Sequence, residues 1–297
     1  MSGIILNVRD DTERMPNLYV VATPIGNLED ITLRALRILR EVKLIAAEDT
    51  RTTRKLLNAY EIKTPMTSYY EHNKISKLDR VLQTLEEGDV ALVSDAGMPG
   101  ISDPGYELIV AAGERGFTVV PVPGASAVIS AVAVSGMPTD RFTYLGFLPN
   151  RGPSRRKVLQ NETDTAGTLV IYESPHRVAA ALEDILKTLG NRRIAVCREL
   201  TKLHEEVFRG TVSEAIEHFT LPRGEFTLVI EGRSGDPEPP ARNDIESKLH
   251  ELYLSGLPAR EAVAVVAEST GLSRRELYRT WVNLDKLWDR DNDSGED

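Results

Sequence analysis

Residues 94–105, with the sequence SDAGMPGISDPG, contain the densest group of residues that could bind a ligand. They follow an apolar, strand-like run, and ligands of open α/β sheets bind outside the carboxyl ends of the strands. Three glycines let the backbone approach a ligand closely. Asp95 and Asp103 can accept hydrogen bonds from a cationic or hydroxyl-bearing ligand. A surface connection also uses turn residues, but two acids among three glycines favour a ligand-binding loop.

Two further segments follow strand-like runs and could complete a pocket. Residues 22–32, ATPIGNLEDIT, contain neither a Walker A motif nor a G-x-G-x-x-G fingerprint, and a strand-to-helix turn capped near Asp30 would have the same sequence features. Residues 121–131, PVPGASAVISA, begin a predicted helix near Ser126 and Ala127. Free backbone N–H groups at such a start can hold a carboxylate, although any capped helix looks alike.

Four polar segments lie beside these loops: EDTRTTRK (48–55), YYEHN (69–73), GPSRRK (152–157) and YESPHR (172–177). Arginines interleaved with tyrosines can hold phosphates and stack on unpaired bases. We therefore predict that a polyanionic substrate contacts Arg51, Arg54, Arg155, Arg156, Lys157, His176 and Arg177. The alternative is a set of solvated charges, with a structural role for His176. Because the net charge is −9, nucleic acid must be held by such local clusters.

The composition indicates a globular protein of a reducing compartment. A chain of 297 residues, 41% of them hydrophobic, can form two modest domains. The single cysteine, Cys197, excludes an intramolecular disulfide, no Cys/His cluster has zinc spacing, and we expect this thiol to be buried. The longest apolar run is shorter than the roughly 18 residues that cross a bilayer. These features predict a cytoplasmic protein without a bound metal.

The order of apolar runs predicts an α/β protein with two lobes. After a loose leader (residues 1–16), strands alternate with amphipathic helices through residues 17–124, which is typical of a parallel sheet. Residues 125–234 contain more closely spaced strands and predict a second α/β lobe with a mixed sheet. A proline-rich linker (235–244), a helical extension (245–289) and an acidic tail (290–297) follow.

These segments together resemble the tetrapyrrole-methylase-like methyltransferases, and within them the branch that methylates cytidine 2′-hydroxyls of 16S ribosomal RNA. The resemblance rests on YVVATPIGNLEDITLRAL, AAEDTRTT, SYYEHN, LVSDAGMPGISDPG, VPGASA, YLGFLP, YESPHR and RGEFTLVIEG, with TGLSRRELY in the extension. It implies a cleft between two α/β lobes that binds S-adenosylmethionine. It also implies a homodimer whose substrate is 16S ribosomal RNA or the small ribosomal subunit.

The resemblance also implies which residues contact the cofactor. They are Pro24, Asp95, Ala96, Gly97, Met98, Ile101, Ser126, Ala127, Leu148, Glu173, Glu225, Phe226 and Thr227. A ribose hydroxyl is weakly acidic, so a general base would help the transfer. Candidates for that base are Glu48, Asp49, His72 and Glu173, and the sequence does not choose among them.

Two other functions compete with RNA methylation. A corrinoid or porphyrinoid methylase shares the chemistry, but its first loop is usually glycine-rich, unlike ATPIGNLED, and the arginine-rich segments disfavour it. A ligand-sensing regulator would use residues 257–281 as a DNA-binding helix-turn-helix, with Arg274 and Arg275 at the start of its second helix. The alanines and valines of residues 259–266 would be buried in any helical hairpin, so packing alone explains them without DNA binding.

Overall fold

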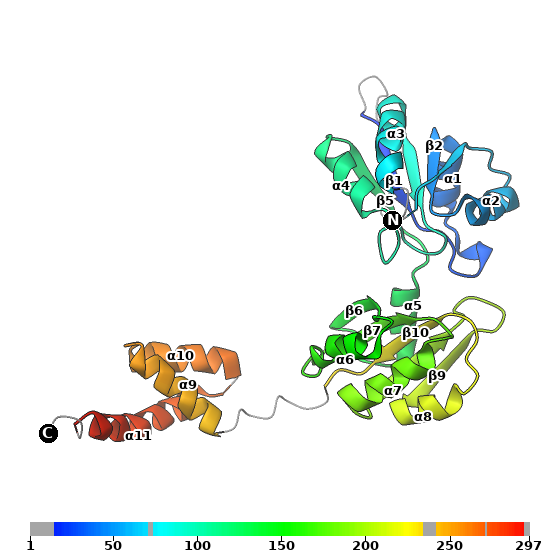
Figure 1. Ribbon diagram of the computed structural model, residues 1–297. Helices are drawn as coiled ribbons and strands as arrows, with labels where there is room; N and C mark the ends of the chain where they lie inside the picture. Colours follow the sequence, from blue (N-terminus) through cyan, green and yellow to red (C-terminus); the bar gives the residue numbers. More distant parts are fainter. Residues whose placement is uncertain (1–14, 71–73, 234–241, 271, 294–297) are drawn as a thin grey trace, which may run out of the picture. The chain divides into compact units, whose positions relative to one another are not determined.

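The computed structural model describes residues 15–70, 74–233, 242–270 and 272–293, and the chain divides into two compact units. The first unit spans residues 1–233 and contains two α/β lobes, and the second spans residues 234–297. This confirms the predicted fold class of a parallel-sheet lobe, a mixed-sheet lobe and a helical unit (Figure 1).

The first lobe is a parallel sheet with helices on both faces. Its strands are β1 (Asn17–Val21), β2 (Leu44–Ala47), β3 (Met66–Ser68), β4 (Val90–Val93) and β5 (Thr118–Val122), in the order β3-β2-β4-β1-β5. Its helices are α1 (Leu33–Glu41), α2 (Thr50–Ala59), α3 (Lys74–Glu87) and α4 (Tyr106–Glu114), with a short 3-10 helix η1 (Leu28–Asp30) before α1. The strand β3 was not predicted from the sequence.

The central strands of this sheet, β1, β2 and β4, are buried on both faces, which explains their apolar runs. In β4, Ala91 and Val93 pack with α1 and α2, whereas Val90 and Leu92 pack with α3 and α4. Alternate residues of a strand point to opposite faces, so a strand covered by helices on both sides has no polar position. The sheet is therefore a rigid frame for the loops at its carboxyl edge.

The second lobe is a mixed sheet. Its strands are β6 (Phe142–Phe147), β7 (Thr168–Glu173), β8 (Arg193–Arg198), β9 (Glu206–Thr211) and β10 (Phe226–Ile230), in the order β6-β7-β10-β8-β9. Only β6 and β7 pair in parallel; the other neighbours are antiparallel. The helices α6 (Gly152–Gln160), α7 (Val178–Leu189) and α8 (Val212–His218) cover one face, and α5 (Ala127–Ser135) covers the other. The helix α6 was not predicted from the sequence.

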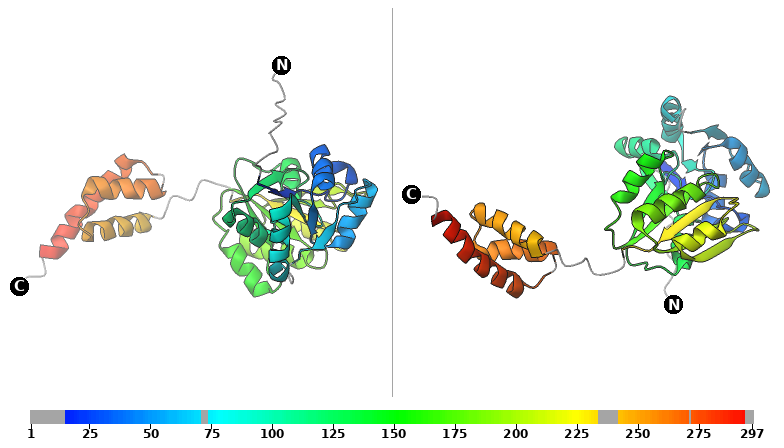
Figure 2. Two further views of the ribbon diagram at one scale, coloured as in Figure 1. Left: turned by 90° about the horizontal axis from the view of Figure 1, so that it is seen from above. Right: turned by 60° about the horizontal axis from the view of Figure 1, so that its bottom comes forward.

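The second unit is a bundle of three helices with its own core (Figures 1 and 2). They are α9 (Arg242–Leu254), α10 (Ala259–Thr270) and α11 (Arg274–Asp293). Ala262, Val263 and Val266 are buried there, and the rings of Tyr253 and Trp281 meet edge to face at 5.8 Å.

The helical bounds differ from the predicted ones. The first helix of the unit begins at Arg242, three residues before the predicted extension, and α11 runs through Asp293 into the predicted acidic tail. Residues 1–14 and 234–241, which contain most of the predicted leader and linker, lie outside the described residues, as does the second half of the predicted tail (294–297). In the described ranges, no helix combines the length and apolar character needed to cross a bilayer.

Candidate active site

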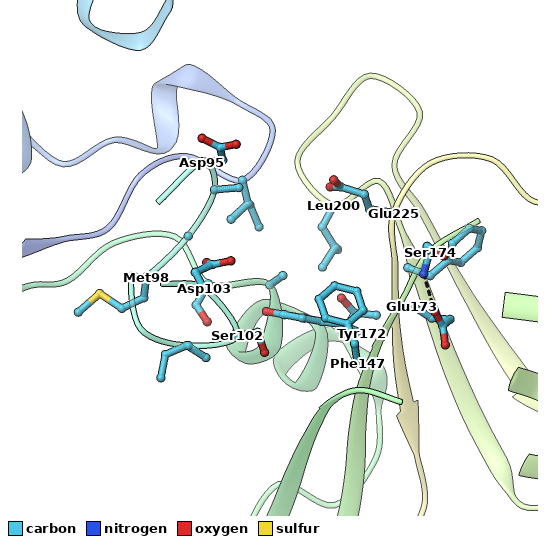
Figure 3. Close-up of a pocket in the computed structure, with 18 of the residues that line it drawn as sticks. Asp95, Met98, Ser102, Asp103, Phe147, Tyr172, Glu173, Ser174, Leu200 and Glu225 are labelled. Atoms are coloured by element: carbon cyan, nitrogen blue, oxygen red, sulfur yellow. Dashed lines mark hydrogen bonds between the residues drawn. The ribbon is translucent and has the colours of Figure 1, made fainter. Parts of the chain in front are cut away.

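A cavity of about 470 Å³ lies within the first unit, between the carboxyl edge of the parallel sheet and the second lobe (Figure 3). This volume is typical of small-molecule sites. Its lining residues are Ile25, Glu48, Asp95, Ala96, Gly97, Met98, Ile101, Ser102, Asp103, Ser126, Ala127, Phe147, Tyr172, Glu173, Ser174, Pro175, Cys197, Leu200, Glu225, Phe226 and Thr227. Both lobes therefore build one pocket.

The loop after β4 is tied to the loop after β1 by backbone hydrogen bonds. The Thr23 N–H donates to the Gly97 carbonyl (2.9 Å), and the Gly97 N–H donates to the Thr23 carbonyl (3.1 Å). The Thr23 hydroxyl also donates to the Ser94 carbonyl (3.1 Å). Gly97 has φ +81°, a conformation that side-chain-bearing residues rarely adopt. The glycine at position 97 therefore allows the two loops to pair by hydrogen bonds at the pocket wall.

Acidic side chains dominate the polar lining. Glu48, Asp95, Asp103, Glu173 and Glu225 all line the cavity, and no lysine, arginine or histidine is among the lining residues of the described chain. Two of these acids also hold the strand ends together. Glu48 accepts from the Asp95 N–H (3.1 Å), and Asp95 accepts from the Asp49 N–H (3.1 Å). Such a lining favours a cationic ligand.

Burial shifts the acidity of three lining carboxyls. Desolvation raises the pKa of Asp103 to about 7, and the nearby Glu48 carboxylate adds to this shift. The same two causes raise the pKa of Asp95. Burial also raises the pKa of Glu173, against the opposing effect of the Ser174 N–H (2.9 Å). The Oε2 atom of Glu173 is buried and accepts no hydrogen bond within the described structure, so a ligand donor could satisfy it.

All predicted cofactor residues line this cavity except Pro24 and Leu148. Pro24 is half-buried beside the lining residue Ile25. Leu148 is 2% exposed in the core of the second lobe, and its carbonyl accepts a hydrogen bond from the Arg177 guanidinium. Leu148 therefore faces the protein interior, and Pro24 lies in the loop beside the pocket, so neither residue lines the pocket.

The lining also contains residues that were not among the predicted site residues. They are Ile25, Ser102, Asp103, Phe147, Tyr172, Ser174, Pro175, Cys197 and Leu200. Asp103 could have been predicted, since it is one of two acids in the glycine-rich loop. Tyr172 and Ser174 could also have been predicted, because they flank Glu173. No local feature of the sequence indicated Leu200. Cys197 is buried, as predicted, and burial raises the pKa of its thiol to about 11.

The four candidate bases have different locations. Glu48 and Glu173 line the pocket. Asp49 does not; it is the N-cap of α2, and its ion pair with Arg51 (2.6 Å) lowers its pKa to about 2. A carboxylate this acidic is a weak base. His72 lies outside the described residues.

None of the predicted substrate-binding residues lines the pocket. Arg54, Lys157 and His176 are exposed, and Arg51 is exposed apart from its pair with Asp49. Arg177 is partly buried and pairs with Glu173 (3.2 Å). A phosphate-bearing substrate could therefore reach the exposed cations only outside the cavity.

Arg155 does not have the exposed position that the prediction of RNA contact requires. It is 6% exposed and pairs with Asp184 of α7 (2.6 Å), and Arg156 pairs with the same carboxylate (2.9 Å). The two arginines lower the pKa of Asp184 against its desolvation. The pairing joins α6 to α7, because a buried guanidinium needs a compensating charge. Arg155 is therefore a structural residue here.

We expect Asp184→Asn to destabilise the first unit by about 3 kcal/mol, because it leaves the Arg155 charge buried without a counter-ion. For a domain of this size, the melting temperature should fall by roughly 6–12 °C. The exposed neighbour Glu183 provides the control, and Glu183→Gln should change the melting temperature little. Equal melting temperatures for the two variants would contradict this account of the ion pair.

Comparison with known proteins identifies the family. Residues 17–216 match the profile of the tetrapyrrole (corrin/porphyrin) methylases, and residues 247–283 match that of the RsmI C-terminal HTH domain. A protein from Halalkalibacterium halodurans named ribosomal RNA small subunit methyltransferase I is 47% identical over 89% of this chain and 94% of its own length. The chain belongs to the ribosomal RNA small subunit methyltransferase I family, within the tetrapyrrole methylases.

Other similar proteins differ in how much of this chain they match. A Synechocystis member is 46% identical over 90% of this chain and 98% of its own length. A Thermotoga maritima member is 53% identical over 222 residues, which are 74% of this chain but 100% of that protein. That relative is about as long as the first unit alone. The crystal structure of a cobalt precorrin-4 methyltransferase matches with a TM-score of 0.56 at 16% identity, over 72% of this chain and 94% of the other, which shows the shared fold.

S-adenosylmethionine is the cofactor of this family, and the pocket fits it. The molecule has a positive sulfonium and ammonium, which suit the acidic lining. Its adenine suits apolar surfaces such as those of Phe147 and Leu200. Its carboxylate suits the start of α5, where Ser126 is the N-cap and makes no side-chain capping bond of its own.

Proposed function

We propose that the protein transfers a methyl group from S-adenosylmethionine to the 2′-hydroxyl of a cytidine in 16S ribosomal RNA. The observation that carries this proposal is the identity to ribosomal RNA small subunit methyltransferase I proteins over nearly the whole chain. The choice of a cytidine 2′-hydroxyl rests on the resemblance of the loop motifs. The substrate is 16S ribosomal RNA or the small ribosomal subunit.

The pocket supports this chemistry through its charge. S-adenosylmethionine supplies an electrophilic methyl group on a positive sulfur. Five lining carboxylates stabilise a cation at this place, and the demethylated product has lost the sulfonium charge. The residues therefore favour the donor over the product, which helps exchange after each turnover. Holding donor and hydroxyl in line supplies much of the rate of such a transfer.

RNA binding falls to surfaces outside the pocket. In the first unit, Arg54, Lys157 and His176 are exposed. In the second unit, Arg274, Arg275 and Arg279 are exposed on α11, and Tyr278 between them is 51% exposed. Guanidinium groups beside an exposed phenol suit phosphates and unpaired bases. We propose that these residues hold ribosomal RNA.

The test is nucleoside mass spectrometry of 16S RNA from a strain with and without the gene, and of RNA treated with the pure enzyme. We expect one cytidine to gain a methyl group on its ribose only when the enzyme is present. In vitro, S-adenosylmethionine and either naked 16S RNA or 30S subunits would identify the form of the substrate. Methylation of a base, or of a corrinoid in place of RNA, would contradict the proposal.

The homodimer and the cytoplasmic location are further parts of the proposal. The homodimer rests on the family resemblance, and the location rests on the single buried thiol and on a ribosomal substrate. The two competing functions have less support. The 47% identity to a ribosomal RNA methyltransferase favours RNA over a porphyrinoid, and the helix-turn-helix profile that matches the second unit is the one described for this methyltransferase family.

A further inference from the structure

We propose that Asp103 is the catalytic residue that accepts the proton of the ribose 2′-hydroxyl, an inference that rests on the proposed function. The residue was not among the candidate bases of the sequence. It follows Ser102 in the loop after β4 and lines the cavity opposite the second lobe. In Figure 3, its carboxyl group lies between Asp95 and the aromatic rings of Tyr172 and Phe147.

Three of the other lining carboxylates already have backbone or charged partners. Glu48 and Asp95 each accept a backbone N–H from the opposite strand end, both at 3.1 Å. Glu225 pairs with Lys202 (2.9 Å) and is 77% exposed.

Glu173 is occupied at one oxygen only, since its Oε2 atom accepts no hydrogen bond in the described structure. Its Oε1 atom accepts from the Ser174 N–H (2.9 Å) and pairs with Arg177 (3.2 Å). In the described structure, the Asp103 carboxylate has neither a backbone donor nor a cation, and the Ser94 hydroxyl is the one neighbouring group that lowers its pKa. It is therefore the lining carboxylate whose ionised form no cation and no backbone donor stabilises, which favours its taking a proton from a substrate.

The protein holds the loop around Asp103 in a defined position. Ser102 has φ +64°, an uncommon conformation for a residue with a side chain, and its hydroxyl bonds to the Tyr144 phenol of the second lobe (2.7 Å). Two residues later in the chain, Gly105 packs so closely that a Cβ atom there would lie 2.9 Å from Leu92. Strained backbone of this kind persists at functional sites because surrounding contacts maintain it. These contacts fix the carboxylate between the lobes.

The surroundings make Asp103 a stronger base than an ordinary aspartate. Burial raises its pKa to about 7, and the groups that face it are Glu48 after β2, Ser94 and Asp95 after β4, Tyr144 of β6 and Tyr172 of β7. No cation faces it within the described chain. A base works best when its pKa is near the operating pH. A bound cationic donor lowers this pKa, so the group is ionised at neutral pH when the donor is present.

The O–H bond of the ribose breaks and its proton passes to the Asp103 carboxylate. The oxygen electron pair forms a bond to the methyl carbon, and the carbon–sulfur bond breaks, leaving its electrons on sulfur as a neutral thioether. The carboxyl then returns the proton to water. No oxidant or reductant is required.

The test is single-turnover methylation of 16S RNA by Asp103→Asn in the full chain, at saturating RNA and S-adenosylmethionine, from pH 5.5 to 9. The wild-type rate should rise tenfold per pH unit at low pH and level off as the carboxyl ionises. Asp103→Asn should lose about 10²- to 10³-fold in rate and show no such rise. Calorimetry should still detect donor binding, weaker than in the wild type because one lining carboxylate is lost, and this binding also shows that the variant folds.

Two further variants make the outcome specific. Asp103→Glu keeps a carboxylate and should retain the pH-dependent rise at a reduced rate. Glu225→Gln removes a charge from the same pocket and should weaken donor binding while keeping the rise. A rate loss in Asp103→Asn that saturating donor restores, or a persistent rise with pH, would overturn the inference. Wild-type enzyme that methylates no ribosomal RNA would instead refute the proposed function.

Discussion

Gly97→Val should weaken the binding of S-adenosylmethionine at least 100-fold. At φ +81°, a β-branched residue is strongly disfavoured, and the strain costs about 1–3 kcal/mol. A Cβ atom at this position would meet Ile25 at 3.5 Å, which is an ordinary contact. The effect therefore comes from the backbone. Relief of the strain would break the paired hydrogen bonds to Thr23 and displace the pocket wall.

The measurement is the melting shift that the donor causes. At 100 times its Kd, a ligand stabilises the native state by about 2.7 kcal/mol, which corresponds to roughly 5–10 °C for a domain of this size. Gly97→Val should show almost no shift. Gly116 provides a matched control, because it has the same φ of +81° but lies in the turn between α4 and β5, with no atom within 4 Å of a Cβ.

We expect Gly116→Val to lower the melting temperature of the free protein through the same backbone strain, and to keep the full donor shift. If both valine variants lose the shift, the loss reflects general destabilisation. If neither loses it, the loop after β4 does not form the donor site.

Truncation after Arg233 should leave a protein that folds, binds the donor and methylates ribosomal RNA with a KM for RNA at least tenfold higher. The two units have separate cores, since the residues that bury Leu249 and Trp281 all belong to the second unit. The pocket lining belongs entirely to the first. The Thermotoga maritima relative, which is about as long as the first unit, has the same family name. We therefore expect kcat to change within about threefold.

The control keeps the full chain and replaces Arg274, Arg275 and Arg279 with alanine. These side chains are exposed, so the unit should fold. The variant should reproduce most of the rise in KM and reduce the salt dependence of RNA binding, because fewer phosphates are neutralised. Loss of donor affinity on truncation would show that the second unit supports the pocket. An unchanged KM would remove it from RNA recognition.

Much of the fold could be predicted because its determinants are local. The apolar run of β4 has no polar position, which is typical of a strand covered on both faces. The glycines and acids of residues 94–105 are contiguous, and strand carboxyl ends are where α/β sheets bind ligands. Two short elements could not be predicted in this way. The strand β3 has three residues, too few to show an alternation of apolar and polar side chains. The helix α6 begins in a glycine-, proline- and arginine-containing stretch that is typical of a basic loop.

The pocket itself combines residues whose proximity no local pattern encodes. Leu200 and Cys197 reach it because β8 pairs with β10, where Cys197 lies beside Thr227. Tyr144 and Tyr172 face Asp103 because the second lobe stands against the loop after β4. Strand order depends on which apolar faces pack together over long sequence separations, so these neighbours became visible only with the three-dimensional fold.

Charged side chains show most clearly the difference between what the local sequence determines and what the tertiary structure determines. Residue types alone suggested that Arg54 and Arg155 were equivalent cations beside a pocket. The fold leaves Arg54 exposed and buries Arg155 against Asp184, 29 residues away. A local pattern specifies periodicity, turns and the carboxyl ends of strands, because these depend on neighbouring residues. Whether a charge meets solvent, a ligand or a buried counter-ion depends on how distant elements pack, because desolvation and pairing are properties of the whole environment.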